Sequence, residues 1–151
     1  MISVCETPFD PSEQIGAFDK NAGDAGAIVS FLGKVRGKAG ADDVNGLFLE
    51  HYPGATEKSI QEIEKTAHKR WAIDDVLIIH RVGLLMPGEP IVLVCVSAAH
   101  RRDAFEAADF LMDFLKTKAM FWKKEIRIDG EAWIEPREDD YKDAKRWQWD
   151  N

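Results

Sequence analysis

Two strongly apolar segments joined by a short turn constrain the fold of this chain most. They are "DVLIIHRVG" at 75–83 and "IVLVCVSA" at 91–98, and the intervening "MPGEP" has the composition of a turn. Short apolar runs rich in β-branched residues and bounded by glycine and proline are typical of strands. The sequence therefore predicts two strands here.

Further strands and two long helices surround this pair. Strands are predicted at 25–37, before the glycine-bearing loop "GKAGADD", and at 44–52, which ends at Pro53-Gly54. Apolar spacings of three and four predict one helix over 56–71, with Thr56 as N-cap and Glu57 in its first turn. A second helix begins near His100. The apolar stripes are Ile60, Ile63, Ala67 and Trp71 in the first helix and Phe105, Ala108, Met112 and Leu115 in the second.

The C-terminal part is predicted to hold a hairpin followed by an acidic tail. Asp129-Gly130 between "KKEIRI" and "EAWIE" indicates a tight turn. The tail "PREDDYKDAKRWQWDN" is compatible with a helix, and its Trp147 and Trp149 need cover from the core or from a partner. Because strands come in pairs between only two long helices, the predicted class is α+β with a mainly antiparallel sheet.

Length, charge and cysteine usage exclude several classes of protein. A chain of 151 residues predicts a single domain over 1–151. No run approaches the ~18 apolar residues that span a bilayer, and no secretory signal is visible, so we expect a cytoplasmic protein without a membrane partner. The net charge of −7 argues against nucleic-acid binding. Cys5 and Cys95 form no disulfide framework, no zinc-ligand spacing occurs, and Cys95 is expected to be a buried thiol.

The predicted start of the second long helix carries cations where a helix disfavours them. A helix N-terminus holds about +0.5 of a charge, so each cation of "HRR" at 100–102 costs about 0.3–1 kcal/mol. A bound phosphate would offset this cost, because hydrogen bonds to charged groups contribute about 1.5–3 kcal/mol each. Alternatively, Arg101 and Arg102 lie in water, screened by Asp103 and Glu106. We favour water for Arg102, whereas a backbone-bonded His100 and an anion-binding His100 remain equally open.

Two other segments concentrate basic residues. Lys34 and Arg36 alternate along "FLGKVRG", so both point to one face and Val35 to the other, either as the floor of an anion site or as a solvated strand end. Lys116 and Lys118 end the second helix, where cations suit the negative pole.

Lys123 and Lys124 follow the aromatic pair Phe121-Trp122. Mutual repulsion and partial burial lower the proton affinity of lysines, as a proton-transfer group near neutral pH requires. Paired lysines are also common at helix ends, so this signal alone is weak. His51 and His80 interrupt apolar strands and are interpreted first as structural histidines, and His68 is expected at the surface.

Several segments together resemble the family of large, catalytic subunits of molybdopterin synthase, the MoaE family. These segments are "SFLGKVRG", "LFLEHYPGATEKSI", "VLIIHRVGLLMPGEPIVLVCVSAAHR", "AFEAADFLMDFLKTKAMFWKKE" and the closing "KRW". Residues up to about Ala22 carry little of the match. The resemblance implies an α/β hammerhead fold, which agrees with the paired strands.

The resemblance also implies partners and a reaction. Such subunits form a homodimer, and a small ubiquitin-like sulfur-carrier subunit docks on each copy to give a heterotetramer. The carrier's C-terminal Gly-Gly thiocarboxylate enters a pocket of the large subunit. Two sulfurs pass to cyclic pyranopterin monophosphate, whose cyclic phosphate opens as the dithiolene of molybdopterin forms. No active-site cysteine is required, because the sulfur arrives on the partner. No cofactor and no metal is expected.

Site residues are carried over by motif. Lys116 of "LKT" and Lys123 of "FWKKE" match the family's two catalytic lysines, with Lys116 against the carrier's C-terminus. The substrate-binding positions implied are Lys34, Val35 and Arg36 of "KVR", His100 and Arg101 of "AHR", the two lysines Lys116 and Lys123, Lys124 and Glu125 of "KKE", and Arg137 of "PRE". Met120 stands where the pattern leads us to expect a proline, a change that loosens the approach to Lys123 slightly.

Two other functions remain open from the residues alone. One is a non-catalytic module that binds a phosphorylated metabolite or an acidic peptide tail. The other is a dimerising structural protein with Trp147 and Trp149 at its interface and solvated cations.

Overall fold

The computed structural model describes residues 1–39 and 42–147. Gly40 and Ala41 of the predicted loop, and Trp149 of the tail, lie outside the described residues. The helices are α1 (Pro11–Lys20), α2 (Ala55–Arg70), α3 (Arg101–Thr117) and α4 (Glu138–Lys145). The strands are β1 (Ile2–Cys5), β2 (Ala27–Lys34), β3 (Lys38–Ala39), β4 (Asp42–Asp43), β5 (Gly46–His51), β6 (Ile73–Arg81), β7 (Gly83–Leu85), β8 (Pro90–Ala98), β9 (Phe121–Arg127) and β10 (Gly130–Ile134).

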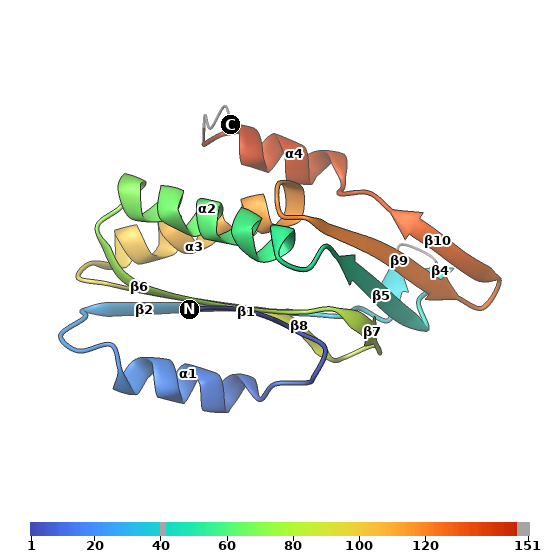
Figure 1. Ribbon diagram of the computed structural model, residues 1–151, viewed down its shortest axis with the longest axis horizontal. Coiled ribbons are helices and arrows are strands. Elements are labelled where there is room, and N and C mark those ends of the chain that lie inside the picture. The colour runs from blue at the N-terminus through green and yellow to red at the C-terminus, as the bar shows by residue number, and fades with distance from the viewer. Residues whose placement is uncertain (40–41, 148–151) are drawn as a thin grey trace.

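The first sheet has the strand order β1-β6-β8-β2 and lies between two layers of helix. Its β6–β8 and β8–β2 pairs are antiparallel, and β1 runs parallel to β6. Figure 1 shows α2 and α3 over one face of this sheet and α1 over the other. The prediction of an α+β fold with a mainly antiparallel sheet and two long helices is confirmed.

The apolar runs in β6 and β8 are continuous because helices cover both faces of their sheet. Side chains alternate between the faces of a strand. Val76 and Ile78 therefore join the core beneath α2 and α3, whereas Leu77 and Cys95 pack with Phe18 of α1. The predicted burial of Cys95 is confirmed, and this burial raises the pKa of its thiol to about 11.

The second sheet has the order β10-β9-β5-β7, and all its neighbouring strands are antiparallel. Figure 1 shows it beyond the ends of α2 and α3. The predicted hairpin is confirmed as β9–β10. Its register pairs Arg127 with Gly130, so the turn consists of Ile128 and Asp129 and begins one residue earlier than predicted.

The predicted N-cap of the first long helix is wrong by two residues. The cap of α2 is Gly54, whose φ of +86° suits a glycine, and Glu57 in the first turn accepts the Gly54 N–H at 2.5 Å. Thr56 is buried instead. Its Oγ1 accepts the Tyr52 N–H and donates to the Met120 carbonyl, both at 2.8 Å, so it ties the helix to the start of β9.

The predicted apolar stripe of the second long helix is partly wrong. Ala108 and Leu115 are buried and Met112 is half-buried, but Phe105 is 61% exposed. The buried stripe is Ala104, Ala107, Ala108, Phe110, Leu111, Phe114 and Leu115. The small alanines at the N-terminal end of this stripe let α3 pack closely against the sheet. The helix is therefore rotated about its axis so that Phe105 points away from the core.

The strand predicted at 25–37 is shorter than expected. The ladder between β2 and β8 shifts register between Gly33 and Lys34, where β2 ends. Beyond the shift, the Val35 N–H donates to the Glu89 carbonyl at 3.0 Å and the Val35 carbonyl accepts the Gly88 N–H at 2.8 Å. The predicted "MPGEP" turn therefore holds the segment after β2 in place.

The N-terminal strand and helix were not predicted. The Asp10 side chain caps α1 by accepting the Ser12 N–H at 3.0 Å, and Pro11 occupies the first helical position. At the other end of the chain α4 is helical, as the tail composition allowed. None of the described helices could cross a membrane.

The core of the chain covers Trp147. Its ring packs edge-on against Trp71 and Phe110 at 5.4 and 5.6 Å between centroids. Its Nε1–H donates to the Asp113 carboxylate at 2.6 Å. Trp147 is therefore covered by residues of its own chain, which is one of the two possibilities predicted for it.

Candidate functional site

A cavity of about 810 Å³ opens where the end of β2, the C-terminal end of α3, β9 and the start of α4 meet. Among the described residues, seven cationic side chains line it against three carboxylates. The cations are Lys34, Arg36, Lys38, Lys116, Lys123, Arg127 and Arg137, and the carboxylates are Glu125, Glu135 and Asp140. A chain with a net charge of −7 thus concentrates positive charge in one concave site, which suits an anionic ligand.

Strand alternation in β9 divides its charged residues between two faces. Lys123, Glu125 and Arg127 face the cavity. Lys124 does not line it. Its ammonium lies 3.1 Å from Glu131 and packs over the Trp133 ring on the opposite face, so this predicted substrate-binding residue is not brought to the site of its own chain.

Glu125 is the acidic residue of the cavity floor. It is buried, and its Oε1 accepts a hydrogen bond from Arg127 Nε at 3.2 Å and a further, shorter one from Nη2. The guanidinium offers a planar pair of donors to the carboxylate. Arg127 is consequently oriented by Glu125 within the cavity wall.

Lys116 reaches the cavity from the last turn of α3. Its side chain is 43% exposed, and its Nζ lies 3.9 Å from Asp140 Oδ1. Arg137, just before α4, also approaches this carboxylate, with Nη2 at 3.6 Å. Lys116 and Arg137, both implied as site residues by the resemblance, therefore share the carboxylate of Asp140.

Lys123 lies deeper than Lys116. Burial is the main cause that lowers the pKa of its ammonium, and repulsion from Lys116 lowers it further, while Asp140 and Glu125 raise it. The prediction that burial and clustered lysines reduce the proton affinity of Lys123 agrees with these directions. Such a lysine can exchange a proton nearer neutral pH than a solvated one.

His80 forms part of the cavity floor. It is buried, its ring stacks on Phe121 at 3.9 Å, and its Nδ1 lies 2.9 Å from the Arg81 carbonyl. Because only a protonated Nδ1 can donate to that carbonyl, Nε2 is the acceptor nitrogen. Burial lowers the pKa of His80 to about 4, and nearby Lys123 also lowers it. The interpretation as a structural histidine is confirmed, and the residue also borders the site.

The segment after β2 presents its cations as the alternation predicted. Lys34 and Arg36 are exposed at the cavity, whereas Val35 is buried in the core with Leu47 and Leu85. Val35 therefore anchors the segment through packing while its two neighbours line the cavity.

The cations at the start of α3 lie away from this cavity in a single chain. His100 is the N-cap without a side-chain capping bond, and Arg101 begins the helix. Arg101 and Lys116 are 15 residues apart in one helix, a separation of about 22 Å along its axis. Arg102 is paired with Glu106 at 3.7 Å, so the solvated interpretation favoured for it is confirmed.

Met120 precedes β9 and is fixed by α2. Its N–H donates to Ser59 Oγ at 3.3 Å, and its carbonyl accepts from Thr56. A proline at this position would have no N–H to donate. The hydrogen bonds to α2 hold the approach to Lys123 at this position.

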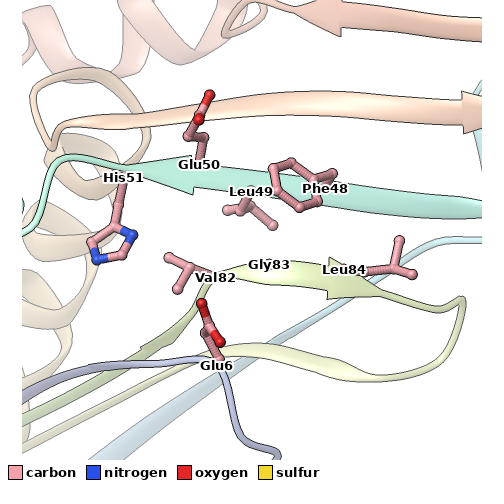
Figure 2. A pocket seen from close by; sticks show the side chains of 8 residues that line it. All are labelled: Glu6, Phe48, Leu49, Glu50, His51, Val82, Gly83 and Leu84. Atoms are coloured by element: carbon pink, nitrogen blue, oxygen red, sulfur yellow. The ribbon is translucent and has the colours of Figure 1, made fainter.

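A smaller hollow of about 490 Å³ lies between β5 and β7. Figure 2 shows His51 and Leu49 of β5 on one side, Val82 on the other, and Glu6 reaching in from the segment after β1. None of the cations implied as site residues lines it. The larger cavity is therefore the candidate site.

Five polar residues among those described at the candidate site were not predicted as site residues: Lys38, His80, Arg127, Glu135 and Asp140. The sequence favours a structural role for His80 over a site role. Arg127 shares the cavity face of β9 with Lys123 and Glu125, so strand alternation was a usable signal for it. Asp140 reaches the cavity because α4 packs beside it, and the spacing of residues along the chain does not predict this packing.

Comparison with known proteins supports a close relationship to one family. The family model described as MoaE protein matches residues 4–118. The "Molybdopterin synthase catalytic subunit" of Escherichia coli (strain K12) is 49% identical over 97% of each chain. A solved structure, the "Molybdopterin biosynthesis MoaE protein from Burkholderia ambifaria MC40-6", is 42% identical with a TM-score of 0.82 over 99% of each chain.

The likeness extends to more distant structures. The structure titled "Molybdopterin Synthase from Staphylococcus aureus" is 32% identical with a TM-score of 0.80, covering 87% of this chain and 95% of that one. The fold, the order of the motifs and the matched length agree. The chain belongs to the MoaE protein family.

Proposed function

We propose that this chain is the catalytic subunit of a molybdopterin synthase and acts as a sulfurtransferase in molybdenum cofactor biosynthesis. It transfers sulfur from the thiocarboxylated C-terminus of a small ubiquitin-like carrier subunit to cyclic pyranopterin monophosphate, forming the molybdopterin dithiolene. One observation carries the proposal: Lys116 and Lys123 meet in a cationic cavity in a chain of the MoaE family.

The two lysines take different roles. Lys116 is half-exposed at the end of α3, so it can meet an extended chain terminus and stabilise the negative charge that develops as sulfur leaves the thiocarboxylate. Lys123 is half-buried and has a lowered pKa, so it moves protons on the pterin side. Neither role needs a cysteine, which agrees with the burial of Cys95.

The phosphate group of the precursor is the anion that the other cations of the cavity bind. Arg36 and Arg137 are exposed at the cavity, and guanidinium groups bind phosphate through two parallel hydrogen bonds. Lys34 adds charge, Glu125 orients donors beside it, and the backbone at Val35 fixes the segment. We infer that His100 and Arg101 serve the cavity of a second copy in the expected homodimer.

The assembly proposed is a homodimer with one carrier subunit docked on each copy, as a heterotetramer, and residues 1–151 form the single catalytic domain. We propose that the reaction takes place in the cytoplasm. Trp147 packs within its own chain, which weakens the alternative of a structural protein that dimerises through this residue.

The test mixes the purified chain with a thiocarboxylated carrier and the cyclic precursor and measures the dithiolene product. We expect product in proportion to the thiocarboxylate consumed. Saturable binding of the precursor with no product and no loss of thiocarboxylate would favour a non-catalytic module for a phosphorylated metabolite or acidic tail, and would refute the proposal.

A further inference from the structure

Asp140 is a buried carboxylate where α4 meets the cavity. It is 9% exposed, whereas Glu138 and Asp139 in the same first turn are exposed to solvent. A buried carboxylate needs hydrogen bonds and a counter-charge to offset its lost hydration. Its surroundings therefore indicate what it does.

Both oxygens of Asp140 are engaged. Oδ2 accepts the Arg137 backbone N–H at 2.9 Å, which closes the N-terminus of α4. Oδ1 lies 3.9 Å from Lys116 Nζ and 3.6 Å from Arg137 Nη2. The helix end fixes the carboxylate, and the carboxylate in turn gives the Lys116 ammonium a fixed partner.

Lys123 has no such direct partner in the described part of the chain. Among the ion pairs within 4.0 Å in residues 1–39 and 42–147, none includes Lys123. Asp140 nevertheless acts on it through space, since it is one of the two carboxylates that raise the pKa of Lys123 against burial and the repulsion of Lys116. One carboxylate thus influences both lysines, directly in one case and at a distance in the other.

We propose that Asp140 is a positioning residue for the two lysines: it holds the Lys116 ammonium at the cavity wall and leaves Lys123 without a direct counter-ion. Lys116 is thereby kept as the anion-binding group and Lys123 as the proton-exchanging group. This division rests on the proposed sulfur-transfer function and explains how two lysines in one cavity take separate roles.

Other charged groups also face Lys123 and enter any titration of it. Those that line the cavity with it are Lys34 of β2, Arg36, Lys38 of β3, His80 of β6, Lys116 of α3, Glu125 and Arg127 of β9, Glu135 after β10, and Arg137 and Asp140 at α4. Only Asp140 among them contacts Lys116 within 4.0 Å in the described part of the chain.

The test uses Asp140→Asn in the full chain, because an amide oxygen still accepts the Arg137 N–H while the charge is lost. The matched control is Asp139→Asn, which removes a neighbouring exposed charge from the same helical turn. Lysines labelled at Cε with ¹³C are titrated by NMR and assigned with Lys116→Arg and Lys123→Arg. We expect the Lys123 midpoint to move to lower pH in Asp140→Asn and to stay in place in Asp139→Asn.

A second readout is the pH profile of single-turnover sulfur transfer. The limb that reports Lys123 should move to lower pH in Asp140→Asn, with a rate at neutral pH reduced about tenfold. Absence of transfer by the wild-type chain would contradict the proposed function. The NMR titration of Lys123 would still test the effect of Asp140, because it does not depend on activity.

Two results would overturn the proposal. One is a Lys123 titration unchanged by Asp140→Asn. The other is loss of folding in both Asp140→Asn and Asp140→Ser, whose hydroxyl can also accept the Arg137 N–H, because this would assign the carboxylate to the fold alone.

Discussion

Burial lowers the pKa values of two basic residues that line the cavity. Desolvation is the largest cause of the lowered pKa of both Lys123 and His80. The imidazole of His80 is therefore neutral near pH 7, and the ammonium of Lys123 loses its proton more readily than a solvated lysine does. Arg36 and Arg137 are exposed at the same cavity and offer guanidinium donors to an anion.

His80 predicts a pH dependence of stability. Its pKa is about 4 in the folded chain against 6.5 when unperturbed, so the unfolded state binds the proton first as the pH falls. The contribution of the buried neutral ring is complete above about pH 6.5 and is lost as the pH falls to about 4, a change of roughly 3 kcal/mol.

Urea unfolding of the wild type and His80→Gln between pH 4 and pH 8 measures this contribution. The difference in unfolding free energy between the two proteins should be largest near pH 7 and shrink toward pH 4. A difference that stays constant across this range would contradict the buried neutral state of His80.

At the scale of elements, the rotation of α3 decides which aromatic residue stabilises the fold. Phe110 is fully buried and contacts Trp71, Phe114 and Trp147, whereas Phe105 is 61% exposed. We expect Phe110→Ala to lower the free energy of unfolding by about 3–5 kcal/mol. We expect Phe105→Ala to change it by about 0.5 kcal/mol or less.

Chemical denaturation of the two alanine variants provides the measurement, with each serving as the other's control. Equal losses in both variants would show that α3 presents a different face to the sheet.

The periodic pattern located most elements but not their rotation or their partners. Stripes at 105, 108, 112 and 115 and at 104, 108, 111 and 115 fit one helical period equally well, so the spacing alone could not exclude Phe105. The continuous apolar runs of β6 and β8 required cover on both faces, and "DPSEQ" carries the Asp cap and Pro start of α1. Both signals point to α1, which the apolar periodicity alone does not predict.

The candidate site was predictable only in part for a similar reason. Motif resemblance identified Lys116 and Lys123, and alternation explains why Lys124 faces away from them. Asp140 enters the site because α4 packs against α3 and the cavity, a tertiary arrangement that no local spacing encodes.

At the scale of the whole molecule, the described fold separates two groups of cations by the length of α3. The cavity holds Lys116 and Lys123 at one end, and His100 and Arg101 lie at the other. In a homodimer, His100 and Arg101 of one copy can reach the cavity of the other copy, since symmetry places the same surfaces of both copies at one interface. A bound phosphate would then also compensate the cations at the start of α3.

Mixed dimers test this arrangement. Arg101→Ala and Lys123→Ala chains are each expected to be inactive alone, but a mixed dimer would contain one intact cavity if Arg101 comes from the partner copy. Random mixing should then restore about a quarter of wild-type product formation. No recovery in dimers shown to contain both variants would place Arg101 in the cavity of its own chain or outside the site.

The sulfur-transfer role of the cavity is tested most directly by single-turnover product formation with loaded carrier and cyclic precursor. Lys116→Ala, Lys123→Ala and the control Lys142→Ala, an exposed lysine of α4, are compared with the wild type. Removing either cavity lysine should slow dithiolene formation by about a hundredfold or more, as expected for a lost charge-stabilising or proton-transferring group, while the control stays near the wild-type rate. Near-normal turnover in a correctly folded Lys116→Ala or Lys123→Ala chain would contradict the assignment of this cavity as the site of sulfur transfer.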